Sequence, residues 1–560
     1  MGLHDVFSTN LCADSILYIS SRRIYIIIFK FVTQIIQMGF ENEHTVRKYL
    51  MSKGEEAFHH NYEEAINNIK LVFGKKYPMI IDGKIVESPE TFVHTSPIDT
   101  RLRLGYFSRA TTEHVQRAIK AAKRAFEEWR RTDYKYRIGI CVSAANLIAK
   151  RKFELAAWIS YENGKNRYEA IADVDEAIDF IKYYSEEMDR NKGFQIQTKK
   201  ADTNERSRSV MKPFGVCGVI GPFNFPCAIL VGMSMGALVT GNTVVLKPAS
   251  DTPITGYLFA EIMKEAGLPD GVLNFITGSG ETIGKTIVGS KDVAGIVFTG
   301  SKKVGYKMFK ESSRVRPRQI IVEMGGKNPV IVTENADINK AAEGILKAAF
   351  GYSGQKCSAC SRVYVQKNVK DLLIKGLVQR TKNLSIGNPL ERNSFMGPLI
   401  NSSAYNKYKK FAKIAFRDGK VMVGGMVKRN GDSKYGYYVE PTIVDGLPKN
   451  HRLLKEELFV PILCVAQYDD FNEALKLCNE SVYGLTAGIY STRNEEIESF
   501  LENIEAGVLY VNRVTSATTG AMVGCQPFGG WKDSGTTGKG TGGPYYLTQL
   551  MREQSQTIVE

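Results

Sequence analysis

Hydrophobic and polar residues alternate with helical spacing over much of the first third of the chain. Between residues 111 and 184 this spacing predicts long amphipathic helices, for example EHVQRAIKAAKRAFEEWRR. Residues 41–75 show the same pattern. The segment YPMIIDGKIVES (77–88) instead favours a β-hairpin, because Asp-Gly is a preferred pair at a two-residue turn. Residues 190–212 are polar with short β-like alternation, which predicts an exposed arm or a linker.

The pattern changes after Gly215, where short apolar runs are each followed by a helical segment. NTVVLKPAS precedes ITGYLFAEIMKEAG, and AGIVFTGS precedes KKVGYKMFKESS. Such repeated βα units predict a parallel sheet with right-handed crossovers. A second α/β block extends from residue 320 to residue 506. The expected fold class is therefore α/β.

The first 37 residues differ from the rest of the chain. The apolar stretch at 15–38 is broken by Arg22, Arg23 and Lys30, so its apolar pieces are shorter than the ~20 residues of a spanning helix. No small-residue cleavage site follows it. We expect no stable membrane insertion and a folded protein that begins near Met38. Residues 1–37 are then an extension or an over-extended start, with a membrane-associated or targeting segment as the alternative.

Composition adds two constraints. The chain has 560 residues, 43% of them hydrophobic and 24% charged, which is typical of a globular protein of two or three domains. Its net charge of +15 is compatible with acidic ligands or nucleic acid. Because the sequence contains no RNP-like motif, zinc-finger spacing or sustained Lys/Arg run, we expect a scattered basic surface and no nucleic-acid partner.

Nine cysteines are spread thinly, and their odd number favours free thiols in a reducing, cytoplasmic compartment. Two of them, Cys357 and Cys360, occur in GYSGQKCSACSR. This motif is compatible with a metal knuckle, a redox pair, one reactive thiol or a core segment. Because zinc needs two further ligands and neither a second CxxC nor an H-x3-5-H motif is present, we predict no metal. We expect Cys360 to be a small packed residue, with a reversible Cys357–Cys360 disulfide as the alternative.

Residue types around Cys357 fit nucleophilic catalysis. Gly354 and Ser358 leave space for a carbonyl group to approach the thiol. Asn224, in GPFNFP, is a candidate oxyanion donor beside the backbone N–H of Cys357. Glu323, in VEMGGKNP, ends a predicted strand and is a candidate general base. Asn224 and Glu323 each have a structural explanation alone, but with Cys357 they predict a catalytic site.

Two segments point to a nucleotide. GSGETIG (278–284) departs from the Rossmann spacing, whereas FTGSKKVG (298–305) has the strand, tight turn and helix start that can receive a pyrophosphate. Lys247 ends a strand, which is where ligands bind in open α/β sheets.

Seven segments, in this order and spacing, resemble the aldehyde dehydrogenase superfamily from about residue 75 to the C-terminus. They are GPFNFP, LKPAS, FTGSKKVG, EMGGKNP, GQKCSACSR, EELFVP and QPFGGWKDSGTT. The resemblance implies that Cys357 is the nucleophile, Asn224 the oxyanion donor and Glu323 the base that activates the deacylating water. It also implies a set of cofactor contacts: Lys247 to the adenosine ribose, Gly300 and Ser301 to the pyrophosphate, Glu457 to the nicotinamide ribose and Phe459 to the ring.

Within the superfamily, the details resemble members that oxidise glutamate γ-semialdehyde, formed from 1-pyrroline-5-carboxylate, to glutamate in proline breakdown. The small-molecule aldehyde would then be anchored at its amino-acid end by Ser358 and by the loop holding Gly520 and Ala521, whose amides can cradle a carboxylate. Phe225 and Phe528 would flank its aliphatic stem.

Two positions depart from the family pattern. Ser250 stands where many members carry a glutamate that binds the ribose 2′-hydroxyl, so NAD is the expected cofactor and NADP the alternative. Val460 stands where the EExFGP motif has glycine. Rival functions are oxidation of another semialdehyde, thioester transfer to coenzyme A, a catalytically silent scaffold and a thiol–disulfide protein.

The resemblance implies an aldehyde-dehydrogenase-like architecture and a homo-oligomer. The predicted parts are an extension (1–37), a helical and Rossmann-like dinucleotide-binding domain (38–189 with 213–319), an α/β catalytic domain (320–506), a β-rich oligomerisation arm (190–212 with 535–560) and a return segment with the anchor loop (507–534).

Overall fold

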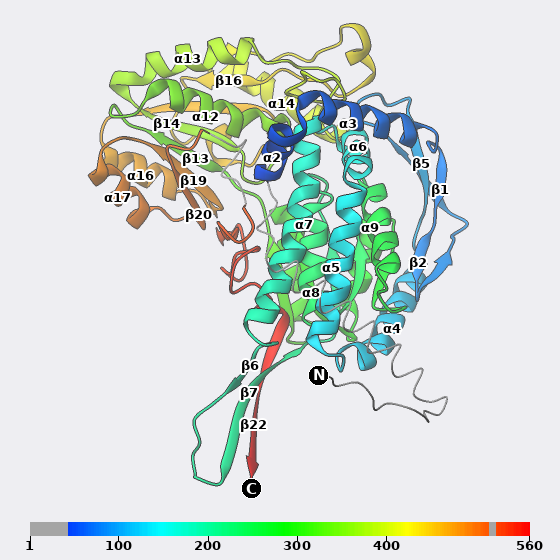
Figure 1. Ribbon diagram of the computed structural model, residues 1–560. Helices are drawn as coiled ribbons and strands as arrows, with labels where there is room; N and C mark the ends of the chain where they lie inside the picture. The colour runs from blue at the N-terminus through cyan, green and yellow to red at the C-terminus, as the bar shows by residue number, and fades with distance from the viewer. Residues whose placement is uncertain (1–42, 515–521) are drawn as a thin grey trace, which may run out of the picture.

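Two seven-stranded sheets organise the computed structural model, which describes residues 43–514 and 522–560 (Figure 1). The predicted extension (1–37) and the predicted anchor residues Gly520 and Ala521 lie outside the described residues.

The first sheet has the strand order β12-β11-β8-β9-β10-β2-β3. Its bounds are β12 (Gln319–Glu323), β11 (Val293–Thr299), β8 (Val216–Ile220), β9 (Thr243–Lys247), β10 (Leu273–Phe275), β2 (Met79–Ile81) and β3 (Lys84–Val86). The five strands from β12 to β10 are parallel, as the βα pattern predicts, and β2 and β3 are added antiparallel. The β2–β3 hairpin confirms the prediction at Asp82-Gly83, where φ is 58° and 69°, the left-handed conformation that this turn requires.

Helices cover both faces of the first sheet. One face carries α4 (Thr112–Trp129), α10 (Gly280–Gly289) and α11 (Lys302–Ser313). The other carries α8 (Ala228–Val239) and α9 (Pro253–Glu265). Outside these pack further helices: α2 (Glu43–Lys53), α3 (Glu55–Lys70), α5 (Tyr134–Lys150), α6 (Lys152–Asn163) and α7 (Arg167–Arg190). Buried Trp129 and Trp158 fill this helical layer.

The second sheet has the order β15-β16-β17-β14-β13-β19-β20, with only β15 antiparallel. Its bounds are β15 (Lys420–Val423), β16 (Thr442–Asp445), β17 (Ile462–Tyr468), β14 (Cys360–Gln366), β13 (Asn328–Val332), β19 (Thr486–Tyr490) and β20 (Val508–Val511). α12 (Ile338–Phe350) and α13 (Lys370–Lys382) pack on one face. The other face is covered by α14 (Ser402–Asp418), α16 (Phe471–Asn479) and α17 (Asn494–Asn503), while α15 (Arg452–Lys455) is a single turn.

The chain passes from one sheet to the other through the loop of residues 324–327. β12 hydrogen-bonds to β11 of the first sheet, and β13 begins the second. The predicted boundary between residues 319 and 320 is therefore corrected, because it separates β12 from the sheet that it joins. β20 likewise extends the second sheet beyond the predicted limit at residue 506. Strand patterning reveals a buried strand but not the sheet to which it hydrogen-bonds.

A third sheet, here called the arm, projects away from the body (Figure 1). It consists of β6 (Gln195–Gln197), β7 (Glu205–Pro213) and β22 (Met551–Val559), all antiparallel. Two smaller sheets contain β1 (Lys75–Tyr77), β5 (Arg103–Ser108) and β4 (Thr91–Thr95), and β18 (Tyr483–Gly484) with β21 (Trp531–Lys532). Within the described residues, no helix combines the length and apolar character needed to cross a membrane.

Candidate active site

Cys357 lies in a turn, residues 355–359, that connects the short 3-10 helix Gly351–Gly354 to β14. We call these five residues the nucleophile turn. Gln355 fixes the start of the turn, because its side chain accepts a hydrogen bond from the Ile400 N–H at 2.9 Å. Cys357 is partly exposed, whereas Cys360 is 3% exposed and packs in the core beneath α12. The prediction that Cys360 is a packed residue is confirmed.

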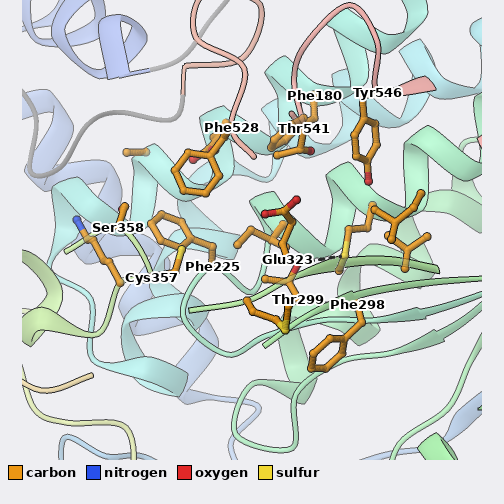
Figure 2. A pocket seen from close by; sticks show the side chains of 18 of the residues that line it. Phe180, Phe225, Phe298, Thr299, Glu323, Cys357, Ser358, Phe528, Thr541 and Tyr546 are labelled. Atoms are coloured by element: carbon orange, nitrogen blue, oxygen red, sulfur yellow. Dashed lines mark hydrogen bonds between the residues drawn. The ribbon is translucent and has the colours of Figure 1, made fainter. Parts of the chain in front are cut away.

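Two cavities meet at Cys357. The open cleft runs along the carboxyl ends of the first sheet's strands and is lined by Asn224, Lys247 and Cys357. The inner cavity lies on the other side and is lined by Glu323, Ser358 and Cys357 (Figure 2). Cys357 is therefore open to two ligands that approach from different directions.

Glu323 ends β12 and extends its half-buried carboxylate into the inner cavity (Figure 2). Its Oε2 accepts a hydrogen bond from the Gly530 N–H at 3.1 Å. Burial raises the pKa of Glu323 to about 8, although the Gly530 hydrogen bond opposes the shift. A carboxyl group with this pKa can both take and release a proton near neutral pH.

Burial also raises the pKa of the Cys357 thiol, which disfavours its reactive thiolate form. Burial, and then the carboxylates of Glu457 and Glu323, raise its pKa to about 12. Hydrogen bonds from the backbone N–H groups of Ser358 and Cys357 act against this rise. The thiolate therefore depends on the local backbone geometry for its stabilisation.

Asn224 lies in the loop between β8 and α8, where the chain turns at the end of a central strand. It is 3% exposed, and it lines the open cleft beside Cys357. The loop is fixed from below by the buried ion pair of Lys165 and Asp173, at 3.0 Å. Asp173 accepts the Ala228 N–H at 2.8 Å, and the Lys165 ammonium lies 3.7 Å from the ring centroid of Phe225. Nothing in the sequence pattern marks this pair, because Lys165, between α6 and α7, and Asp173, on α7, are both far from the loop in sequence.

The open cleft contains five of the six residues predicted to contact the cofactor: Lys247, Gly300, Ser301, Glu457 and Phe459. These residues fit a dinucleotide. Ser301 precedes α11 and its side chain makes no cap, so the first-turn N–H groups of the helix are available for a pyrophosphate. A Cβ at Gly300 would lie 2.5 Å from the Phe298 ring, so only glycine permits this close turn.

Glu457 also lines the open cleft. Its carboxylate accepts the Gly326 N–H at 3.1 Å, and a Cβ at Gly325 would lie 1.9 Å from it. Burial raises the pKa of Glu457, opposed by the Gly326 hydrogen bond and by Lys407 and Lys327. Of the two glycines in the EMGGKNP motif, Gly325 thus makes room for this carboxylate and Gly326 holds it through its N–H.

Ser250 and Val460, the two positions that depart from the family pattern, are both accommodated by the structure. Ser250 is exposed and does not line the cleft, and its hydroxyl donates to the Gly278 carbonyl at 3.3 Å. Phe459 adopts the left-handed conformation in the EELFVP segment, with φ of 56°, whereas Val460 does not. Valine is therefore accommodated at this position without backbone strain.

The inner cavity contains three residues predicted to contact the substrate: Ser358, Phe225 and Phe528. Figure 2 shows the two phenylalanine rings facing the space beside Cys357. Gly520 and Ala521 lie outside the described residues, so their contact with a substrate stays a prediction.

Other residues of the inner cavity were not predicted. Lys356, next to Cys357, pairs with Glu169 at 2.9 Å. Deeper in the cavity, Tyr546 and Thr541 line the wall near Glu323, and the Thr541 hydroxyl is 3.0 Å from that of Tyr184 (Figure 2). Proximity to Cys357 could have indicated Lys356, but no sequence signal indicates the tyrosines.

Residues 85–555 match the aldehyde dehydrogenase family, and the chain belongs to that family. It is 41% identical over 505 residues to a 1-pyrroline-5-carboxylate dehydrogenase of Geobacillus sp. strain WCH70, covering 89% of this chain and 96% of the relative.

Solved structures show the same likeness. The structure of 1-pyrroline-5-carboxylate dehydrogenase from Thermus with bound NAD matches with a TM-score of 0.86 and 37% identity, covering 90% of this chain and 97% of that one. Betaine aldehyde dehydrogenase from Staphylococcus aureus in complex with NAD+ matches with a TM-score of 0.83 and 28% identity, covering 89% and 98%.

Proposed function

We propose that this chain oxidises L-glutamate γ-semialdehyde, the open-chain form of 1-pyrroline-5-carboxylate, to L-glutamate in proline breakdown, with NAD as cofactor and NADP as the alternative. The observation that carries the proposal is the position of Cys357 between two cavities, with the Glu323 carboxylate in one and Lys247 and Glu457 in the other. The names of the relatives and of the NAD-bound structure support the choice of substrate and cofactor.

The Cys357 sulfur attacks the aldehyde carbon, and a C–S bond forms as the carbonyl π electrons move to oxygen. The Asn224 amide and the Cys357 N–H stabilise this oxyanion. NAD bound in the open cleft supplies the acceptor for the hydride that leaves the same carbon. A thioester then links the carbonyl carbon of the glutamate γ-carboxyl group to Cys357.

Glu323 completes the reaction by taking a proton from water as the water oxygen attacks the thioester carbon. The C–S bond breaks, glutamate leaves and the Cys357 thiolate is restored. Because a suitably placed base is present, hydrolysis of the thioester is favoured over its transfer to coenzyme A.

Different residues of the open cleft would bind different parts of the dinucleotide. Lys247 would contact the adenosine ribose, Gly300 and Ser301 the pyrophosphate, Glu457 the nicotinamide ribose and Phe459 the ring. In the inner cavity, Ser358 would bind the substrate carboxylate with the loop holding Gly520 and Ala521, while Phe225 and Phe528 pack on its methylene groups.

We also propose a cytoplasmic homo-oligomer. The eight cysteines of the described residues are free, as expected in a reducing compartment. The arm exposes apolar side chains at Ile196 (66%), Ile558 (44%) and Val559 (65%), and its edge strands have free backbone groups. A second copy of the chain that packs on the arm would cover both features.

Turnover limited by thioester hydrolysis is expected to increase with pH through about 8. The reason is that Glu323 acts as a base only when ionised, and burial raises its pKa to about 8, so the base form is lost below that pH. The check is the pH dependence of steady-state NADH formation at saturating substrate. A Glu323→Gln variant should lose this midpoint, and a wild-type midpoint retained in the variant would contradict the assignment.

The substrate is tested by following reduced cofactor with the purified full chain. We expect 1-pyrroline-5-carboxylate to be oxidised with a kcat/KM at least about tenfold above those of propanal and succinate semialdehyde, since a carboxylate anchor with charge-assisted hydrogen bonds is worth more than ~1.4 kcal/mol. Parallel assays with NADP measure cofactor preference. Turnover with the other aldehydes alone would preserve the chemistry and contradict the substrate.

A further inference from the structure

Three consecutive carbonyl groups of the nucleophile turn accept hydrogen bonds from side chains outside it. The Asn328 amide nitrogen lies 2.7 Å from the Cys357 oxygen and 3.0 Å from the Ala359 oxygen. The Thr486 hydroxyl lies 3.4 Å from the Ser358 oxygen. Two side chains therefore hold the three peptide groups that directly follow Cys357.

Asn328 and Thr486 are held in a rigid frame. They begin the neighbouring parallel strands β13 and β19, and they are 3% and 1% exposed. The Thr486 N–H donates to the Asn328 side-chain oxygen at 3.1 Å, which fixes the orientation of the amide. The amide group therefore presents its N–H₂ side to the turn.

The hydrogen bonds from Asn328 and Thr486 also restrict which backbone N–H groups can face the Cys357 sulfur, because each peptide group is planar. The Cys357 carbonyl and the Ser358 N–H belong to one planar trans peptide, in which the two groups point in opposite directions. A hydrogen bond that draws the carbonyl toward Asn328 directs the N–H away from the sheet. The Ser358 N–H is one of the two backbone groups that act to lower the pKa of the Cys357 thiol.

Gly326 supports the same arrangement from the loop between the sheets. A Cβ at this position would lie 2.7 Å from the Cys357 oxygen and 2.4 Å from the Asn328 Oδ1. The loop that follows Glu323 can thus lie directly beneath the nucleophile turn. The carboxylates that face the thiol, those of Glu323 and Glu457, both oppose its ionisation, so the two N–H groups act against them.

We propose that Asn328 is a positioning residue for the nucleophile: with Thr486, it fixes the carbonyl groups that follow Cys357, so that the Ser358 N–H faces the sulfur. This role rests on the proposed function, in which Cys357 performs the attack. Asn328 lines neither the open cleft nor the inner cavity, so it acts only through the backbone of the turn.

The test uses iodoacetamide, which reacts with the thiolate and needs no aldehyde, so its result is independent of the substrate. Alkylation of Cys357 in the full chain is followed by peptide mass spectrometry, which separates it from exposed Cys525. In Asn328→Ala, the rate constant for alkylation of Cys357 should fall about tenfold at each pH between about 7 and about 10. This is the effect expected when the Ser358 N–H no longer stabilises the charged thiolate. kcat should fall in parallel, with little change in the KM for NAD.

Two further variants make the result decisive. Thr486→Val removes only the longer hydrogen bond and retains the backbone N–H, so we expect a smaller loss of alkylation rate, in the same direction. Tyr468→Phe removes the hydrogen bond from Tyr468 to the Val332 carbonyl in the same sheet without touching the turn, and should leave alkylation unchanged.

An unchanged rate in a folded Asn328→Ala protein would overturn the proposal, as would an equal loss in Tyr468→Phe. If Asn328→Ala does not fold, the Thr486→Val rate decides. A reduced rate supports the proposal and an unchanged rate overturns it.

Discussion

Cys357→Ser is expected to abolish aldehyde oxidation, whereas Cys360→Ala should retain most of it. Serine preserves the size of the side chain, but its hydroxyl is far less acidic than a thiol and no base within the turn activates it. We expect a loss of at least about 10³-fold in kcat, in the range seen when a covalent nucleophile is removed. The measurement is NADH formation with 1-pyrroline-5-carboxylate at saturating cofactor.

Cys360→Ala is the matched control for this variant. Cys360 is 3% exposed, and its sulfur lies 3.7 Å from the Arg362 carbonyl oxygen, away from both cavities. Its replacement removes one buried atom and should cost about 1 kcal/mol of stability with little change in rate. Equal inactivity of the two variants, both folded, would instead support a catalytic pair of cysteines.

Glu323→Gln is expected to separate the two halves of the reaction. Glutamine can still accept the Gly530 N–H but cannot take a proton from water. The first turnover should therefore release one NADH per active site at close to the normal rate, and steady-state turnover should then fall about 10²–10⁴-fold. Rapid-mixing absorbance measurements resolve the two phases.

The control for this variant is an external nucleophile. Hydroxylamine attacks a thioester without the help of a base, so its addition should restore much of the lost turnover. A Glu323→Gln protein with normal steady-state turnover, or one with a slow first turnover, would contradict the role assigned to Glu323.

The residues proposed to act in catalysis could be selected from the sequence because each lies beside a local constraint visible there. Glu323 precedes the two glycines that make room for Glu457 and for the Cys357 carbonyl, and Asn224 lies between prolines at the end of a strand. Asp82-Gly83 likewise marked its hairpin correctly. The glycine pair, the proline-flanked Asn and the Asp-Gly turn each involve residues only a few positions apart, so a local reading of the sequence can find them.

The supporting contacts could not be predicted because they join residues that are distant in sequence. Asn328 and Thr486 are 158 residues apart, and Lys165 reaches Phe225 from the connection between α6 and α7. Each residue looks ordinary in its own segment, since an Asn before a proline and a Thr in a strand have common structural roles. The strand order of the sheets, which brings β13 beside β19, is not encoded in local periodicity.

The most direct test of the account is to trap the intermediate. Glu323→Gln, mixed with NAD and 1-pyrroline-5-carboxylate and quenched in acid after the first turnover, is analysed by peptide mass spectrometry. We expect a glutamyl thioester on the peptide that contains Cys357, located on that residue rather than on Cys360. A modification on Cys360, or rapid NADH formation with no covalent adduct, would contradict it.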